Sequence, residues 1–124
     1  MEELIKALDN NLKLDNCIVE ENTIILDISS TSKTAICPFC GKESPYVHSK
    51  YTRTFQDSPI QNKKVTINLA NRKLLCKNPN CPHTTFAERF EFIKFKAKKT
   101  NRLVDEIYNI AMNVSFFNSN KYIK

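Results

Sequence analysis

A chain of 124 residues can form one domain, or one small domain with appendages, and its 41% hydrophobic content allows a modest core. It is small for an enzyme. The formal net charge of +6 and the pI near 9.1 favour an anionic partner. No apolar run approaches a membrane span and no signal-peptide pattern opens the chain, so we expect a soluble, cytoplasmic protein with no membrane partner.

The first 33 residues predict a short helix followed by a β-hairpin. Apolar residues recur at helical spacing over residues 1–12, at Leu4, Ile5, Leu8 and Leu12. Two apolar runs, 17–19 and 23–28, are separated by polar residues, which is typical of a hairpin. The second run alternates as a strand, with one face formed by Ile24, Leu26 and Ile28. Cys17 lies on the first run, where we expect a buried, reduced thiol rather than a metal ligand.

Two close cysteine pairs bracket the middle of the chain. The first is Cys37-Pro38-Phe39-Cys40-Gly41 and the second is Cys76-Lys77-Asn78-Pro79-Asn80-Cys81. A tight turn carrying two cysteines can offer both sulfurs to one ion, and zinc accepts four thiolates at about 2.3 Å. Proline, glycine and asparagine suit such turns. The pairs therefore predict one structural Zn²⁺ bound by Cys37, Cys40, Cys76 and Cys81.

Other uses of these cysteines are open at this point. Two disulfides would use the same sulfurs, but an intracellular chain seldom keeps disulfides. A redox Cys-x-x-Cys would need a thioredoxin-like βαβ context, and nothing helical follows Cys40. His48 or His83 could replace one cysteine as a ligand, although four cysteines already complete a closed site.

The segment between the cysteine pairs predicts two long antiparallel strands. Residues 46–55 form the first, with His48, Lys50, Thr52 and Thr54 on one face and Ser49, Tyr51, Arg53 and Phe55 on the other. We expect a turn at 56–59 and 61–62, and a return strand from Lys63. The alternation on that strand changes phase after Leu69, which predicts a bulge near Ala70-Asn71.

Basic residues on these strands and beyond them are candidates for contacts to DNA phosphates. The candidates are Lys50, Arg53, Lys63, Lys64, Arg72, Lys73, Lys77, Lys98, Lys99 and Arg102. The alternative is that lysines on a small ribbon only keep its edges soluble. No base-reading motif is visible in this sequence.

The C-terminal part predicts a phenylalanine-rich connector and an amphipathic helix. The connector carries Phe86, Phe90, Phe92 and Phe95, which we expect to pack on the ribbon. From Thr100 or Asn101 as the cap, an apolar stripe runs along the helix through Leu103, Ile107, Ile110, Ala111 and Val114, with Phe116 and Phe117 beyond it. The stripe would either fold back on the connector or pair between chains, and the charged segment 94–99 favours pairing.

Four segments in order resemble one family. They are Cys37 to Gly41, the string Val47-His48-Ser49-Lys50-Tyr51-Thr52-Arg53-Thr54-Phe55-Gln56-Asp57, Cys76 to Cys81, and Thr85-Phe86-Ala87-Glu88-Arg89. The chain is similar from about residue 1 to about residue 115 to the amino-terminal zinc-finger domain of bacterial insertion-sequence transposases of the L-three family. The resemblance implies that the four cysteines bind zinc.

In that family the finger precedes a helix-turn-helix region and an acidic-triad catalytic domain of RNase-H type. Neither fits whole within 124 residues, so we expect no catalysis from this chain. The expected divisions are 1–33, helix and hairpin; 34–92, zinc ribbon; and 93–124, basic linker and helix, as the start of a truncated helix-turn-helix region. The expected fold class is α+β, a small zinc ribbon with a helix at each end.

Three functional hypotheses follow. The first is a zinc-binding module that binds double-stranded DNA at transposon ends, associated with the nucleoid, and with homo-oligomerisation through the C-terminal helix. The second is a protein–protein interaction module that orders the transposase assembly, and a non-functional truncated transposase remnant is a separate alternative. The third, a catalytic or redox protein, is disfavoured because a closed four-sulfur site leaves no position for substrate.

Overall fold

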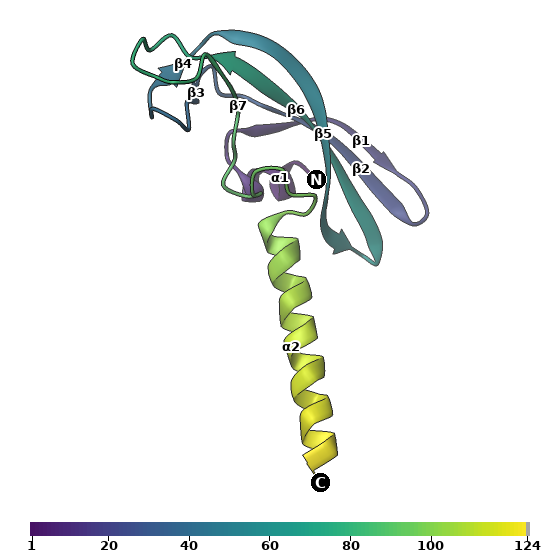
Figure 1. Ribbon diagram of the computed structural model, residues 1–124. Helices are drawn as coiled ribbons and strands as arrows, with labels where there is room; N and C mark the ends of the chain where they lie inside the picture. The colour runs from purple at the N-terminus through teal and green to yellow at the C-terminus, as the bar shows by residue number, and fades with distance from the viewer. Residues whose placement is uncertain (124) are drawn as a thin grey trace.

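The computed structural model describes the backbone of residues 1–123 and the side chains of residues 1–113. Its elements follow in the order α1 (Glu2–Leu8), β1 (Leu12–Val19), β2 (Thr23–Ser30), β3 (Ala35–Ile36), β4 (Glu43–Ser44), β5 (Val47–Ile60), β6 (Lys63–Leu75), β7 (Thr85–Ala87) and α2 (Asn101–Ile123). In the view of Figure 1, α1 lies on the same side of the strand-rich body as the start of α2, and α2 projects away from that body. The predicted α+β zinc ribbon with a helix at each end is confirmed.

One sheet joins the N-terminal hairpin to the two long strands. Its order is β1-β2-β6-β5, with β7 also paired to β6. β2 runs parallel to β6 and places Leu26 beside Ile67, whereas the β1–β2 and β5–β6 pairs are antiparallel. Residues 1–33 and 34–92, which the sequence led us to divide, therefore share one hydrogen-bonded sheet.

The main core lies on one face of this sheet. Its buried side chains are Ile5, Leu12, Ile24, Leu26, Ile28, Phe55, Val65, Ile67, Leu69, Phe92 and Ile93. The predicted alternation of β2 is thus confirmed. Cys17 packs against this core as a free thiol, but it is half-buried and not fully buried as predicted.

The first helix is shorter than predicted. It ends at Leu8 because Asp9 takes an extended conformation and accepts a hydrogen bond from the backbone of Asn11 at 2.9 Å. Leu12 therefore begins β1 instead of closing the helix, and it is buried in the core from there.

The predicted turn at 56–59 is wrong, because β5 continues through it to Ile60. The register shifts between Asp57 and Ile60, and such an irregularity accommodates Pro59 in a strand. The chain reverses at Gln61 and Asn62, with φ of 49° and 64°. Two successive left-handed residues form the two-residue turn that suits the twist of a hairpin.

The change of phase on β6 marks a second core and not the predicted bulge. Pairing with β5 is unbroken from Leu69 to Lys73, and the irregularity lies on β5 between Val47 and Ser49. Beyond Leu69 the buried residues include Leu74, which has the opposite parity and packs with Ala35, Cys37 and Phe86. The strand therefore buries opposite faces along its two halves.

The connector packs on the sheet at three of its four phenylalanines. Phe86 joins the second core, Phe92 joins the main core, and Phe90 packs against the main core while half-buried. Phe95 is 50% exposed, so the packing prediction was wrong for this residue.

The start of α2 is fixed to β5 by a buried carboxylate. Thr100 caps the helix, since its Oγ1 accepts from the Leu103 N–H at 3.3 Å and donates to Asp57 at 2.7 Å. Arg102 donates to both Asp57 oxygens, through Nε at 2.7 Å and through Nη2. Burial alone would raise the pKa of Asp57, but the hydrogen bonds from Arg102 and Thr100 outweigh it and lower the pKa.

The body of α2 leaves its apolar side uncovered. Leu103 is buried, whereas Ile107 and Ile110 are 46% and 56% exposed. Beyond Leu103, the fold-back onto the connector is therefore not found for the described side chains of this helix, and the predicted Val114, Phe116 and Phe117 lie outside them. Within the described residues, neither helix is both long enough and apolar enough to cross a membrane.

We predict that Asp57→Asn lowers the free energy of unfolding by about 2 to 3 kcal/mol, because it leaves Arg102 without its carboxylate. Arg102 is 33% exposed, which keeps the loss below that of a fully buried pair. Urea unfolding measures the change, and the exposed Asp105→Asn is the control on the same helix.

The pH dependence follows from the same carboxylate. Because its folded pKa lies below its unfolded value near 4, its contribution is present above that pH and is lost as the pH falls through the folded pKa. A loss of stability below about pH 4 that is equal in parent and Asp57→Asn would contradict this assignment.

Candidate metal centre

The first cysteine turn follows the short strand β3. The Gly41 N–H donates to the Cys37 carbonyl at 2.8 Å, and the Cys37 N–H donates to the Lys42 carbonyl at 2.9 Å. Gly41 has a φ of 77°, and a Cβ added there would meet no atom within 4 Å. Glycine is therefore required at position 41 because the backbone is left-handed there, and not because a side chain would lack space.

The second turn is held between β6 and β7. The Cys76 N–H donates to the Thr84 carbonyl at 2.8 Å, and the Cys81 N–H donates to the Asn78 carbonyl at 3.0 Å. The Asn78 side chain accepts from the Asn80 N–H at 3.1 Å, which is the local turn expected of asparagine here.

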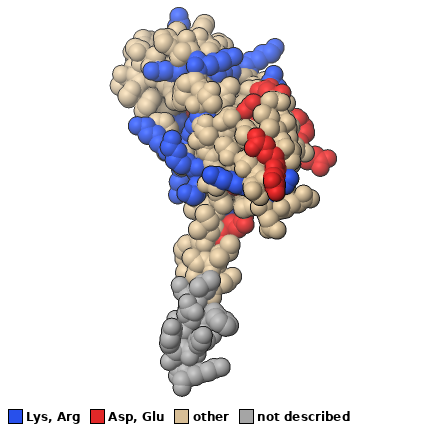
Figure 2. Space-filling view, turned by 90° about the vertical axis from the view of Figure 1, so that its right-hand side faces the viewer, with Lys and Arg blue, Asp and Glu red and all other residues tan. Residues whose placement is uncertain are grey.

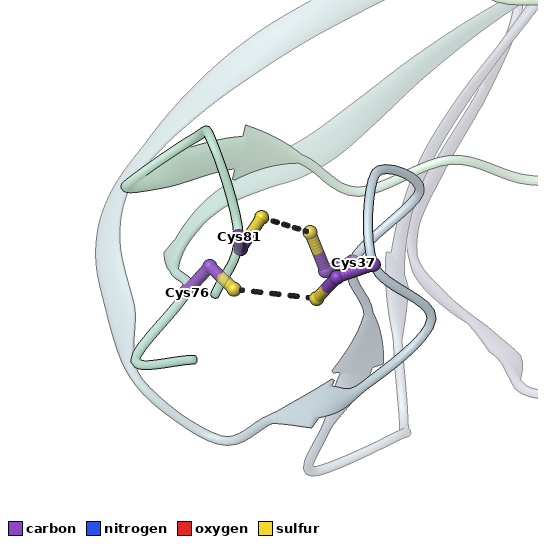
Figure 3. A group of neighbouring side chains, drawn as sticks. Cys37, Cys76 and Cys81 are labelled. Atoms are coloured by element: carbon purple, nitrogen blue, oxygen red, sulfur yellow. Dashed lines mark hydrogen bonds between the residues drawn. The ribbon is translucent and has the colours of Figure 1, made fainter. Parts of the chain in front are cut away.

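The two turns bring four sulfurs together. Their Sγ atoms all lie within 4.8 Å of one another. Cys37 and Cys81 are 3.9 Å apart at sulfur, and Cys40 and Cys76 are 3.6 Å apart. Figure 3 shows Cys76 and Cys81 pointing across the gap toward the turn that carries Cys37.

These distances fit a tetrahedral zinc site. Four sulfurs about 2.3 Å from one ion stand about 3.8 Å from each other. A disulfide needs about 2.05 Å, and all five cysteines are free thiols in this structure. The four cysteines therefore match one structural zinc. Four thiolates would complete the coordination of this ion and leave no position on it for a substrate.

The protonation of the thiols shows why a cation suits the cluster. Hydrogen bonds from the Lys42 backbone and the Asn78 side chain lower the pKa of Cys40 to about 6. A hydrogen bond with the Asn78 backbone lowers the pKa of Cys76. Burial and the neighbouring sulfurs raise this pKa by more, so that it rises to about 12. One thiolate thus disfavours the next, and a bound dication removes this conflict.

The two histidines take other positions. His83 stacks on Phe39 with ring centroids 3.6 Å apart, which joins the two cysteine turns outside the sulfur cluster. His48 is exposed on β5, with Nδ1 3.2 Å from the Ser49 hydroxyl. Neither belongs to the group of side chains that could bind the metal.

A buried ion pair supports the sheet beside the second core. Arg72 donates to both Glu88 oxygens, at 2.9 and 2.6 Å, and to the Ser32 carbonyl at 2.8 Å. The hydrogen bond to Glu88 raises the pKa of Arg72. This arginine, a DNA candidate from the sequence, has its guanidinium committed inside the protein.

The other basic candidates divide into internal and exposed groups. Arg102 is paired with Asp57, and Arg53 donates to the Lys94 and Ala97 carbonyls at 2.8 and 3.0 Å. Lys63 is half-buried, and the exposed candidates are Lys50, Lys64, Lys73, Lys77, Lys98 and Lys99. Lys77 lies 4.8 Å from the centre of the Tyr46 ring.

The sequence reasoning missed the two carboxylates. Asp57 and Glu88 are paired with arginines 45 and 16 residues away, so no local pattern reveals them. Their burial, Asp57 within β5 and Glu88 directly after β7, would have revealed both carboxylates, but it becomes visible only in the folded structure.

The two turns, the four sulfurs and the long arms define a zinc ribbon. Comparison with known families is more specific: residues 33–81 match the zinc-finger of transposase IS204/IS1001/IS1096/IS1165. The resemblance to L-three transposases is confirmed for this segment, which is similar to the zinc finger of these transposases over less than half of the chain. Neither the curated proteins nor the solved structures gave a match to the chain.

We predict one zinc per chain, whose removal by a chelator unfolds the ribbon, because metal binding supplies folding free energy in such sites. Replacing any one of the four cluster cysteines by serine should abolish stoichiometric zinc, and Cys17→Ser should keep it. Elemental analysis gives the metal content. A thiol reagent should find one reactive cysteine before chelation and five after it; five rapidly reacting thiols in fresh protein would contradict the site.

Proposed function

We propose that this chain is a DNA-binding module of transposase type, which recognises the ends of a transposon and performs no catalysis itself. The zinc-finger family match supplies the class of protein. The role would place the chain with the nucleoid in the bacterial cytoplasm. The charge distribution is the observation that carries the proposal.

The basic charge is concentrated between residues 47 and 102. This segment contains thirteen Lys and Arg residues but only three acidic residues, Asp57, Glu88 and Glu91. Asp57 and Glu88 are buried and paired, which leaves Glu91 as the exposed carboxylate of the segment. Figure 2 shows most Lys and Arg side chains on one side and across the top of the body, with Asp and Glu mainly opposite.

Such segregation favours a polyanion over a solvated face of mixed charge. Lysines that only keep strand edges soluble need no acid-free surface. Phosphates bound by lysines release counterions, which gives affinity without base contacts. The arginines among the candidates serve the fold, so the exposed lysines are the proposed phosphate contacts.

We predict that changing Lys50, Lys73 and Lys98 together to glutamine weakens duplex binding and flattens its salt dependence by about one unit of slope per lost contact. Fluorescence anisotropy at several salt concentrations, with transposon-end and random duplexes, measures both quantities. Zinc content should not change.

The matched control changes Lys13, Lys33 and Lys42 to glutamine; these lysines are also exposed but lie outside the basic segment. Both variants lose the same charge. Equal loss of binding in the two would mean that net charge alone attracts DNA. If the first variant binds duplex as the parent does, the basic face only keeps the protein soluble. If the parent binds transposon-end and random duplexes equally, recognition of transposon ends is contradicted.

A second role, ordering of an assembly, is supported by the uncovered side of α2. Four of its exposed apolar side chains are Val104, Ile107, Ile110 and Met112. Polar residues occupy the opposite side, at Asp105, Glu106, Asn109 and Asn113. We propose that this helix pairs with the same helix of a second chain, since an apolar helix face is stabilised by burial.

We predict concentration-dependent association that is lost when Ile107 and Ile110 are both changed to lysine. Sedimentation velocity over a range of concentrations measures it. Lysine at Asn109 and Asn113 is the control, because it adds the same charge to the polar side of the helix. A parent chain that stays monomeric throughout while α2 is helical would contradict the pairing.

A further inference from the structure

A groove lies beside β5, separate from the zinc cluster. Its volume is about 520 Å³, and it is lined by residues 51–54 of β5, 87–88 at the end of β7, and 95–98 of the connector. The strand forms one wall and the connector the other. Both walls belong to the basic segment.

The connector wall is built in a fixed shape. The Arg53 guanidinium donates to the Lys94 and Ala97 carbonyls, and Lys96 turns the backbone with a φ of 64°. The Arg89 guanidinium lies 4.2 Å from the centre of the Phe95 ring. These contacts order the connector before any ligand arrives, so little conformational entropy is lost on binding.

The groove presents two aromatic rings to solvent. Tyr51 on the strand wall is 45% exposed, and Phe95 on the connector wall is 50% exposed. Three of the four connector phenylalanines pack against the cores, so the exposure of Phe95 departs from its neighbours. Exposed rings in a basic groove are a platform for stacked bases.

The charge of the groove is positive. Lys96 and Lys98 are exposed on its rim, and Arg53 lies in its wall. Its one carboxylate, Glu88, is already neutralised by the two hydrogen bonds from Arg72. A ligand with an aromatic face and an adjacent negative charge fits this combination, and a nucleotide has both.

We propose that this groove binds an unpaired base of DNA against Tyr51 and Phe95, with the flanking phosphates on Lys96 and Lys98. The inference rests on the proposed DNA-binding function and adds a site for a base that has left the stack. In an intact duplex each base is covered by its neighbours and cannot offer its face to a protein ring. The groove therefore distinguishes distorted or open DNA from regular duplex.

The test compares three fluorescent probes of equal length and sequence with the zinc-loaded protein. One is a fully paired duplex, the second carries a single unpaired adenine, and the third carries an abasic site at that position. The second and third probes share the distortion and the phosphates, and they differ in the base alone. We expect the unpaired base to bind about fivefold tighter or more than the abasic probe, since one stacked base contributes about 1–3 kcal/mol.

The variants Tyr51→Leu and Phe95→Leu should remove this preference, because leucine keeps apolar bulk without a ring. Tyr46→Leu is the control, since Tyr46 is also a half-exposed aromatic, at 49%, but does not line the groove. All three variants should keep zinc and bind the paired duplex as the parent does.

Equal binding of the unpaired-base and abasic probes would overturn the base site, and salt-dependent binding of the paired duplex would then leave the proposed function standing. Absence of binding to all three probes would overturn both. A preference that Tyr51→Leu and Phe95→Leu retain would also overturn the proposal, because the base would lie elsewhere.

Discussion

The structure depends on keeping four sulfurs within one sphere. Thiolates this close repel each other, and burial together with the neighbouring sulfurs raises the pKa of Cys76. A dication removes it and closes a loop that contains both long strands. The same closure holds the second half of β6 against β7 and buries Leu74 and Phe86 beside the cysteines. The zinc cluster is thus part of the second core.

The two buried carboxylates link the fold to the surface. Asp57 fixes the start of α2 to β5, and Glu88 fixes the strand that follows the second cysteine turn. Each uses an arginine, whose planar group donates to both carboxylate oxygens at once. Two of the three acids of the basic segment, Asp57 and Glu88, are thereby withdrawn from the surface, while most of its lysines, which form no such fork, stay in solvent. The use of arginine for the buried ion pairs and of lysine at the surface therefore produces both the internal contacts and the positive face.

The sequence allowed the metal site to be predicted because paired cysteines in turns are a local signal. The strands of the main core were also predictable, since β2 and the first half of β6 alternate. Contacts between distant residues could not be predicted from the sequence. The parallel β2–β6 pairing, the Arg72–Glu88 pair and the Asp57–Arg102 pair follow from tertiary packing. The turn was misplaced because Gln56-Asp57-Ser58-Pro59 has turn residues, yet Asp57 is satisfied by α2 and stays in the strand. The bulge was misplaced because a change of buried face produces the same pattern.

Aromatic and cationic side chains connect the metal centre to the groove. His83 stacks on Phe39, Arg89 lies 5.6 Å from the centre of Phe39 and 4.2 Å from the centre of Phe95, and Phe95 forms the connector wall. These contacts run from the two cysteine turns to the rim of the groove, where the Lys96 ammonium lies 5.5 Å from the centre of the Phe95 ring. Each is weak alone, at about 0.5–1 kcal/mol for an exposed cation over a ring. Together they link the exposed ring of Phe95 to the two cysteine turns, so the groove and the metal site are joined by a continuous series of side-chain contacts.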